Sequence, residues 1–181
     1  MNHIGTQNIE TKRFNLRKFQ IDDNEEVYNN WTSDHECAKY SSWKPHKNLK
    51  TTEKYLNNII KKYRKNDYYR WAITDKGTGE VVGSFLVYNI NNKDKSCDVG
   101  YTVARKLWNQ GVATEVLIEV IKYLTEKIGF NTIRAYHYIQ NIASGKVMIK
   151  AGMVYEKNLF MLNGPKIISK CCVYIFKKYE R

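Results

Sequence analysis

Residues 98–117, DVGYTVARKLWNQGVATEVL, join a strand-like run to a helical one through a turn with few side-chain atoms. Gly111 and Ala113 stand where the helix begins, and Arg105 and Lys106 supply positive charge just before it. The first amides of a helix have no intrahelical partner and lie at the positive end of the helix dipole. The stretch is therefore suited to hold a phosphate or a diphosphate. It matches neither the P-loop pattern G-x-x-x-x-G-K-[ST] nor the dinucleotide-binding pattern G-x-G-x-x-G.

The hydrophobic patterning predicts one α+β domain over residues 1–181, with a core at about 9–177 and a mixed sheet of about seven strands. An antiparallel meander comes first, and the order strand, helix, strand, helix then indicates a parallel crossover. We expect strands at residues 11–19, 68–74, 81–90, 97–103, 131–139, 153–162 and 168–177, the last two flanking Asn163-Gly164-Pro165. We expect flanking helices at residues 22–31, 51–65, 114–127 and 143–150. The helix at 114–127 has an apolar face and therefore packs on the sheet, which holds its first turn beside the strand ends.

The formal net charge of +12 at pH 7 is compatible with nucleic acid, a membrane surface or an anionic cofactor as partner. A composition rich in Lys, Asn and Ile explains the same charge without any partner. Cations and rings alternate in residues 61–71, KKYRKNDYYRW, which could suit nucleic acid; we favour a helix end followed by a strand with buried rings. No apolar run reaches ~18 residues and no secretory signal is visible, so we expect a cytoplasmic protein without membrane contact. The four cysteines lack ligand spacing, and we expect reduced thiols and no metal site.

Several segments together resemble the GNAT N-acetyltransferase superfamily over nearly the whole chain. They are DVGY at 98–101, WNQGVATE at 108–115, NIAS at 141–144 with KAGM at 150–153, and SWKPH at 42–46. The last of these is similar to the branch that contains the ribosomal-protein-alanine N-acetyltransferases. Trp108 stands where the superfamily often has Arg or Gln, and Met148 stands where many members have a catalytic tyrosine. The resemblance implies the GNAT fold and acetyl-CoA as co-substrate.

The resemblance also implies where the coenzyme binds. Backbone amides of about 109–114 would hold its pyrophosphate, and the strands that end near Val103 and Gln140 would part to admit its pantetheine arm. Strand amides at Tyr101 and Val103 could pair with that peptide-like arm, as in strand addition. The expected coenzyme-binding residues are Tyr101, Thr102, Val103, Lys106, Asn109, Gln110, Gly111, Val112, Ala113, Thr114, Asn141 and Ser144.

Acetyl transfer to an amine requires removal of a proton from the amine, a donor for the carbonyl oxygen and a proton for the leaving thiolate. The resemblance implies direct attack in a ternary complex, with no covalent intermediate on Cys171 or Cys172. Asp98 and Glu156 are the candidate bases, and either could instead be a surface acid. Ser144 could cap a helix, contact the coenzyme or protonate the sulfur.

The sequence does not identify the acceptor, which could be a peptide N-terminus, such as that of a ribosomal protein, or a small amine. Trp31, Tyr40, Trp43 and His46 are candidates to line its pocket, and their alternative role is a satellite hydrophobic cluster. His137 is more simply a packed strand residue than a site residue. A ribosome- or RNA-associated binding module and an acetyl-CoA sensor with little turnover remain alternatives, and the sequence leaves a homodimer open.

Overall fold

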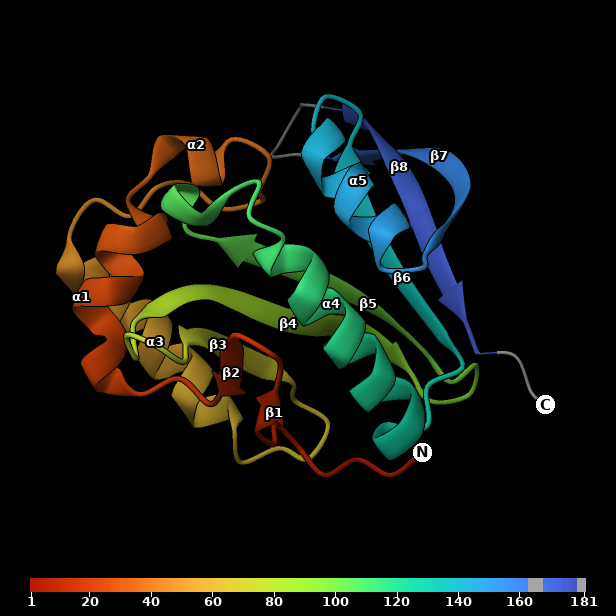
Figure 1. Ribbon diagram of the computed structural model, residues 1–181, viewed down its shortest axis with the longest axis horizontal. Helices are drawn as coiled ribbons and strands as arrows, with labels where there is room; N and C mark the ends of the chain where they lie inside the picture. Colours follow the sequence, from red (N-terminus) through yellow and green to blue (C-terminus); the bar gives the residue numbers. More distant parts are fainter. Residues whose placement is uncertain (163–167, 179–181) are drawn as a thin grey trace.

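One mixed sheet extends through the molecule. The computed structural model describes residues 1–162 and 168–178, and within them eight strands follow the order β1-β2-β3-β4-β5-β6-β8-β7 (Figure 1). All neighbours are antiparallel except β5 and β6, which are parallel. The strands are β1 (Ile9–Glu10), β2 (Phe14–Arg17), β3 (Arg70–Asp75), β4 (Val81–Asn91), β5 (Ser96–Val103), β6 (Thr132–Tyr138), β7 (Val154–Leu162) and β8 (Ile168–Lys177). The predicted α+β fold, meander and parallel crossover are confirmed; the extra strand, β1, is too short to give a sequence pattern.

Helices cover both faces of this sheet. They are α1 (Asn24–Val27), α2 (His35–Ala38), α3 (Leu49–Lys62), α4 (Val112–Tyr123) and α5 (Ile142–Lys150). Along β3, Trp71 and Ile73 belong to a cluster that includes α4, whereas Ala72 belongs to a second cluster with α3. Because successive strand residues point to opposite faces, α4 and α3 lie on opposite sides of the sheet.

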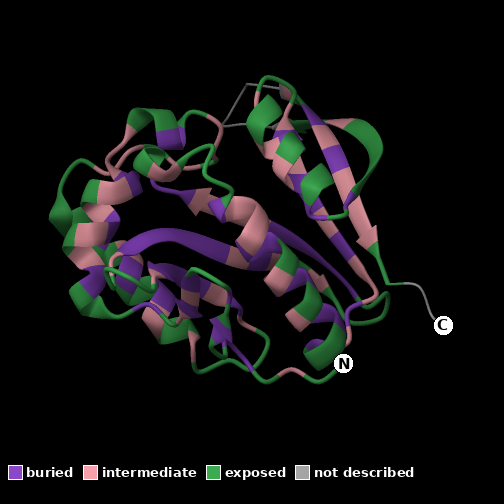
Figure 2. Cartoon of the chain, viewed as in Figure 1, coloured by how far each residue is buried: buried purple, intermediate pink, exposed green. Residues whose placement is uncertain are grey.

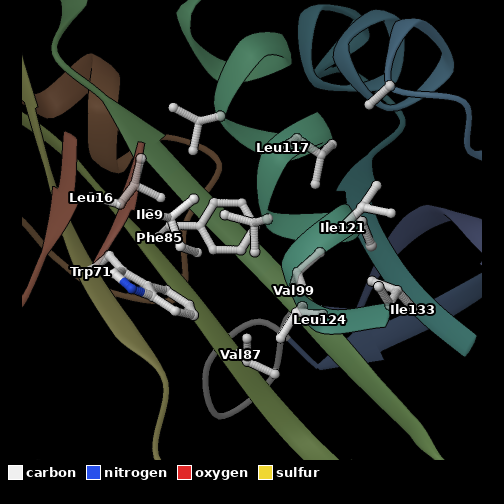
Figure 3. Packing of buried hydrophobic residues seen from close by; sticks show 14 of the residues in the cluster. Ile9, Leu16, Trp71, Phe85, Val87, Val99, Leu117, Ile121, Leu124 and Ile133 are labelled. Atoms are coloured by element: carbon white, nitrogen blue, oxygen red, sulfur yellow. The ribbon is translucent and has the colours of Figure 1, made fainter. Parts of the chain in front are cut away.

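The main core forms where α4 crosses β4 and β5 (Figure 1). The buried side chains of α4 recur at helical spacing, and they are Val112, Val116, Leu117, Val120 and Ile121. Figure 3 shows Leu117 and Ile121 of α4 facing a layer of strand residues that includes Phe85, Val99 and Ile133. Burial is uneven across the sheet: β4 is buried over most of its length, whereas the first residues of β7 are exposed (Figure 2). The core therefore anchors α4 firmly beside the end of β5.

Helix ends differ from the sequence expectation by a few residues, for local reasons. The helix expected at 51–65 begins earlier, at Leu49, because the Asn48 side chain accepts from the Thr51 amide. The helix expected at 114–127 begins at Val112, and it continues as a π-helical turn, Leu124–Ile128, up to Gly129. The helix expected at 22–31 is a 3₁₀ turn (Ile21–Asp23), α1 and a π-helical turn (Tyr28–Thr32) in succession.

The parallel pair β5–β6 is joined over only part of its length. Ser96–Val99 pairs with Thr132–Ala135, and the ladder ends there. β5 nevertheless continues to Val103, where it still pairs with β4, and β6 continues to Tyr138, where it pairs with β8. The two strands therefore part on the side where α4 and α5 begin. This agrees with the expected opening of the sheet, although the opening starts four residues before Val103.

β8 lies between β6 and β7, an order that the sequence pattern did not predict. The predicted turn at Asn163-Gly164-Pro165 lies outside the described residues. Among the helices that are described, each is too short or too polar to cross a lipid bilayer.

Candidate functional site

The mouth of α4, by which we mean its first turn and the loop before it (residues 109–114), has backbone N–H groups without acceptors in the part of the protein that the structure describes. Gly111 precedes the helix with a φ of 77°, and Asn109 also has a positive φ, of 61°. The first helical hydrogen bond in this turn runs from the Glu115 amide to the Gly111 carbonyl at 3.0 Å. Within the described ranges, the amides of residues 109–114 donate to no protein acceptor. The amides of residues 112–114 lie in the first turn of α4 and those of residues 109–111 lie in the turn before it. Together they can bind an anion the size of a diphosphate.

The open edge of β5 adds a second row of donors. The Ala104 amide donates to the Val82 carbonyl of the β4 side at 2.8 Å. In an antiparallel ladder, hydrogen-bonded and non-hydrogen-bonded pairs alternate, so Tyr101 and Val103 direct their N–H groups away from β4. They face the space where β6 has parted from β5. An extended, amide-containing ligand could therefore pair with β5 at this place.

Two cations near the loop are already paired with acids. Arg105 Nε lies 3.0 Å from Asp34 Oδ2, and Lys106 Nζ donates to Glu80. Hydrogen bonds from Lys106 and then from Asn30 lower the pKa of Glu80. A cavity of about 310 Å³ lies beside these pairs, lined by Asn29, Asn30, Asp34, Arg105 and Lys106. Lys106 can contact a bound anion only by sharing or leaving Glu80.

Sequence reasoning missed Arg13 and the role of Glu115. Arg13 Nη2 donates to the Gln110 carbonyl at 3.0 Å, and its Nε donates to Glu115 Oε2 at 2.8 Å. Thr11 Oγ1 donates to the other carboxylate oxygen at 2.6 Å. These groups are about a hundred positions apart in the chain, and no spacing in the sequence indicates their contact.

The start of α5 lies across the gap from β5. Asn141 caps α5, because its Oδ1 accepts from the Ser144 amide at 3.3 Å. Ser144 Oγ lies 2.9 Å from Tyr101 Oη, and either hydroxyl could be the donor. Burial raises the pKa of Tyr101, so its phenol stays protonated and can donate at neutral pH. Met148, one turn further along α5, is buried in the main core.

The two candidate bases are far apart. Asp98 is 3% exposed, and its two oxygens accept from Arg134 Nε at 2.9 Å and from Asn89 Nδ2 at 2.8 Å. Glu156 is exposed at a bulge in β7, where the pairing with β8 shifts between Tyr155 and Lys157. Three strand spacings separate β5 from β7, or about 14 Å at roughly 4.8 Å each. The two carboxylates therefore cannot act on the same acceptor atom in this arrangement.

The four residues expected to line an acceptor pocket divide into two groups. Trp31 is 1% exposed in the second hydrophobic cluster, so its side chain is a core element rather than a pocket wall. Trp43 packs against that cluster, and His46 Nδ1 lies 2.8 Å from Thr52 Oγ1, where either group can be the donor. Only Tyr40 reaches toward the parted strands, with its ring centroid 6.4 Å from that of Tyr138 on β6.

His137 behaves as a packed strand residue. Its Nδ1 lies 2.9 Å from the Tyr138 carbonyl, and its buried Nε2 has no partner among the described residues. A Cβ on Gly145 of α5 would lie 2.8 Å from that Nε2. The ring therefore fills the space that the glycine leaves and sets the distance between α5 and β6.

The alternation of cations and rings at 61–71 has a structural explanation. Tyr69 and Trp71 are fully buried in the main core, and Lys61 and Lys62 lie in the last turn of α3, where cations favour the helix dipole. The buried rings cannot stack on a base. In the described part of the chain, no group of three His, Cys, Asp or Glu side chains is placed to hold a metal ion.

Comparison with known proteins gives consistent matches. The family model described as "Acetyltransferase (GNAT) domain" matches residues 13–154. The N-acetyltransferase YoaA of Bacillus subtilis, itself described as uncharacterized, is 24% identical over 82% of this chain and 83% of its own. A GNAT-family acetyltransferase from Bacillus anthracis superposes with a TM-score of 0.83 at 22% identity, covering 94% and 98% of the two chains. The ribosomal-protein-S5-alanine acetyltransferase from Vibrio fischeri gives 0.80 at 17% identity, covering 94% and 96%.

Proposed function

Because the chain belongs to the GNAT acetyltransferase family, we propose that it moves an acetyl group from acetyl-CoA to a primary amine of a peptide N-terminus or a small molecule. The observation that carries the proposal is the presence of two sets of backbone N–H groups without protein acceptors among the described residues, both near the place where β5 and β6 part. One set is formed by the six free amides of residues 109–114, and the other lies on the open edge of β5. Their chemistry suits the two parts of coenzyme A, a diphosphate and an amide-containing arm.

The residues present fit the coenzyme. The left-handed backbone at Gly111 and the absence of its side chain leave room for a phosphate against the amides. Along the arm, the main chain of Tyr101, Thr102 and Val103 would offer hydrogen bonds on one side. Asn141 and Ser144 would approach from α5 on the other side, and Lys106 would add charge near the loop.

For the transfer, the protein has to position the two substrates, accept a proton from the amine and donate a proton to the leaving thiolate. Bound acetyl-CoA would supply an activated thioester, and the amine would attack its carbonyl carbon directly, giving an amide and a free thiol. The proton lost by the amine would pass to Asp98, through a water, or to Glu156. The paired hydroxyls of Tyr101 and Ser144 would supply a proton to the leaving thiolate.

A covalent route through Cys37 or Cys171 is disfavoured by burial. Burial raises the pKa of the Cys37 thiol to about 11 and also raises that of Cys171, so neither is a thiolate at neutral pH.

The acceptor would enter on the face of the sheet where Tyr40 and Tyr138 meet. The similarity to a ribosomal-protein-S5-alanine acetyltransferase favours a peptide N-terminus as the first acceptor to test.

The decisive experiment combines binding with turnover. We expect acetyl-CoA at a hundredfold excess over its Kd to raise the Tm, by the linkage of binding to unfolding. Thiol release should then follow when peptide N-termini, polyamines or aminoglycosides are added. An unchanged Tm would remove the proposal, whereas a raised Tm without thiol release from any amine would favour a sensor of acetyl-CoA.

A further inference from the structure

The guanidinium of Arg13 lies at the rim of the loop that precedes α4. Its Nη2 donates to the carbonyl of Gln110, and a Cβ built on Gly111 would lie 3.7 Å from that nitrogen. A side chain at position 111 would therefore begin in contact with the Arg13 guanidinium. No other cation among the described residues is hydrogen-bonded to the backbone of residues 109–114.

A fixed set of contacts holds Arg13 in this position. Glu115 Oε2 accepts from Arg13 Nε at 2.8 Å, and Oε1 accepts from the Arg13 backbone amide at 2.7 Å. Thr11 Oγ1 donates to the same Oε1 and accepts from the Phe14 amide at 2.9 Å. A guanidinium has five N–H donors, and the contacts described use two of them. The remaining N–H groups belong to a side chain that is 44% exposed.

The ion pair between Arg13 and Glu115 also balances the negative charge of Glu115 in the first turn of α4. Burial alone would raise the pKa of Glu115, but hydrogen bonds from Thr11 and Arg13 outweigh it and lower the pKa. Glu115 is therefore ionised at neutral pH, in the first turn of a helix whose amides are free for an anion. An uncompensated carboxylate there would repel a phosphate. Arg13 offsets that charge.

We propose that Arg13 is a coenzyme-binding residue, which fixes Gln110 in the loop and presents its free N–H groups to a phosphate of coenzyme A. The inference rests on the proposed function, since it assumes that the loop holds that ligand. The diphosphate and the 3′-phosphate of the coenzyme have the same chemistry toward a guanidinium, and the experiment separates them.

The test measures the Kd of coenzyme A by calorimetry for the wild type, Arg13→Gln, Arg13→Lys and Lys12→Gln. Lys12 is the matched control, because it is exposed, carries the same charge and makes no hydrogen bond or ion pair within the described ranges. We expect Arg13→Gln to weaken binding by about tenfold or more, Arg13→Lys by less, and Lys12→Gln by under about twofold. With acetyl-CoA, Arg13→Gln should raise the KM and leave the kcat at saturation within about twofold.

A double variant tests the charge argument. Arg13→Gln/Glu115→Gln should recover part of the lost affinity, because no carboxylate then faces the phosphate. Dephospho-coenzyme A, which lacks the 3′-phosphate, locates the contact: an undiminished Arg13→Gln effect points to the diphosphate, and a vanished effect points to the 3′-phosphate. A vanished effect supports a phosphate contact directly, and an undiminished effect does so when Arg13→Gln also binds coenzyme A with a weaker salt dependence than the wild type.

Unchanged affinity in Arg13→Gln, with coenzyme bound by the wild type, would overturn this inference and leave the proposed function standing. If the wild type itself does not bind coenzyme A, both fall. The Tm of each free variant shows whether it is folded. If Arg13→Gln does not fold, wild-type affinity in Arg13→Lys overturns the inference.

Discussion

Asp98 has the carboxylate that a general base needs, but in the structure this carboxylate joins two strands. It pairs with Arg134, its neighbour across the parallel β5–β6 ladder, and Asn89 satisfies its second oxygen. A carboxylate held in this way orders two strands, and any proton that it took from an acceptor would weaken those bonds. Glu156 has no such commitment, because it is exposed on the bulge of β7.

Asp98→Asn and Glu156→Gln should therefore differ in stability. Removing the buried charge leaves Arg134 without its partner, and we expect a loss of about 2 kcal/mol, or roughly 5 °C in Tm. Glu156→Gln should change the Tm by less than about 1 °C. Thermal unfolding measures both changes. Separately, kcat measured well below the Tm of each variant identifies the general base. We expect kcat to fall by about a hundredfold when the residue that takes the proton is replaced. Equal Tm values would contradict the structural role of Asp98.

His46 should make the protein sensitive to mild acid. Burial lowers the pKa of His46, whereas in the unfolded chain its pKa is about 6.5. As the pH falls below that value, the unfolded state binds a proton that the folded state resists, so stability falls. His46→Gln should lose less stability than the wild type between pH 7 and pH 5. Urea midpoints at the two pH values measure this, and parallel losses would contradict it.

At the scale of residues, the sequence indicated the turn that we propose to hold a phosphate, but it did not indicate the side chains that support this turn. A glycine before an apolar helical face is a local pattern, and local patterns can be recognised without a structure. The contacts of Arg13 with Glu115 and of Tyr101 with Ser144 join distant parts of the chain. They exist only because the fold places the turn between β1 and β2 beside the first turn of α4, and places α5 across from β5.

At the scale of elements, the turn before α4 combines a backbone requirement with a charge requirement. Gly111 has a φ of 77°, a conformation that Asn tolerates better than most residues. Gly111→Asn and Gly111→Asp are therefore matched in shape and differ mainly in charge. We expect the Asp variant to bind coenzyme A at least tenfold more weakly than the Asn variant, because its carboxylate would pair with the Arg13 guanidinium and add negative charge beside the phosphate. Calorimetry measures both, and equal affinities would show that the loop has another role.

The order of elements was predictable where neighbours in sequence are neighbours in space. The meander of β3, β4 and β5 and the crossover through α4 follow this rule, and the sequence identified them. β8 breaks it by lying between β6 and β7, and only the packing of all three strands selects that order. Helix starts differed by two residues where Asn48 and Gly111 act as caps, because those caps depend on the path of the preceding loop.

At the scale of the whole molecule, the question is whether the net charge of +12 serves a ligand. Screening shortens the reach of a surface charge from about 10 Å at 0.1 M salt to about 3 Å at 1 M. Lys61 and Lys62 lie on α3, on the opposite side of the sheet from α4. We expect salt to weaken coenzyme binding equally in the wild type and in Lys61→Gln/Lys62→Gln, and less in Arg13→Gln. A flatter salt response in the α3 variant would instead show that the overall charge attracts the coenzyme.

The short ladder between β5 and β6 divides the sheet into two parts, here called its two leaves: β1 to β5, and β6 to β8. Four residue pairs join the first five strands to the last three, and the leaves part beyond Val99. A pantetheine arm bonded to one leaf and touching the other would act as a missing strand. The protein would then be stiffest while it is loaded and would loosen after each product leaves, which hydrogen exchange at the Tyr101 and Val103 amides can follow. The exchange protection of these two amides should then differ most between the free protein and the protein with coenzyme bound.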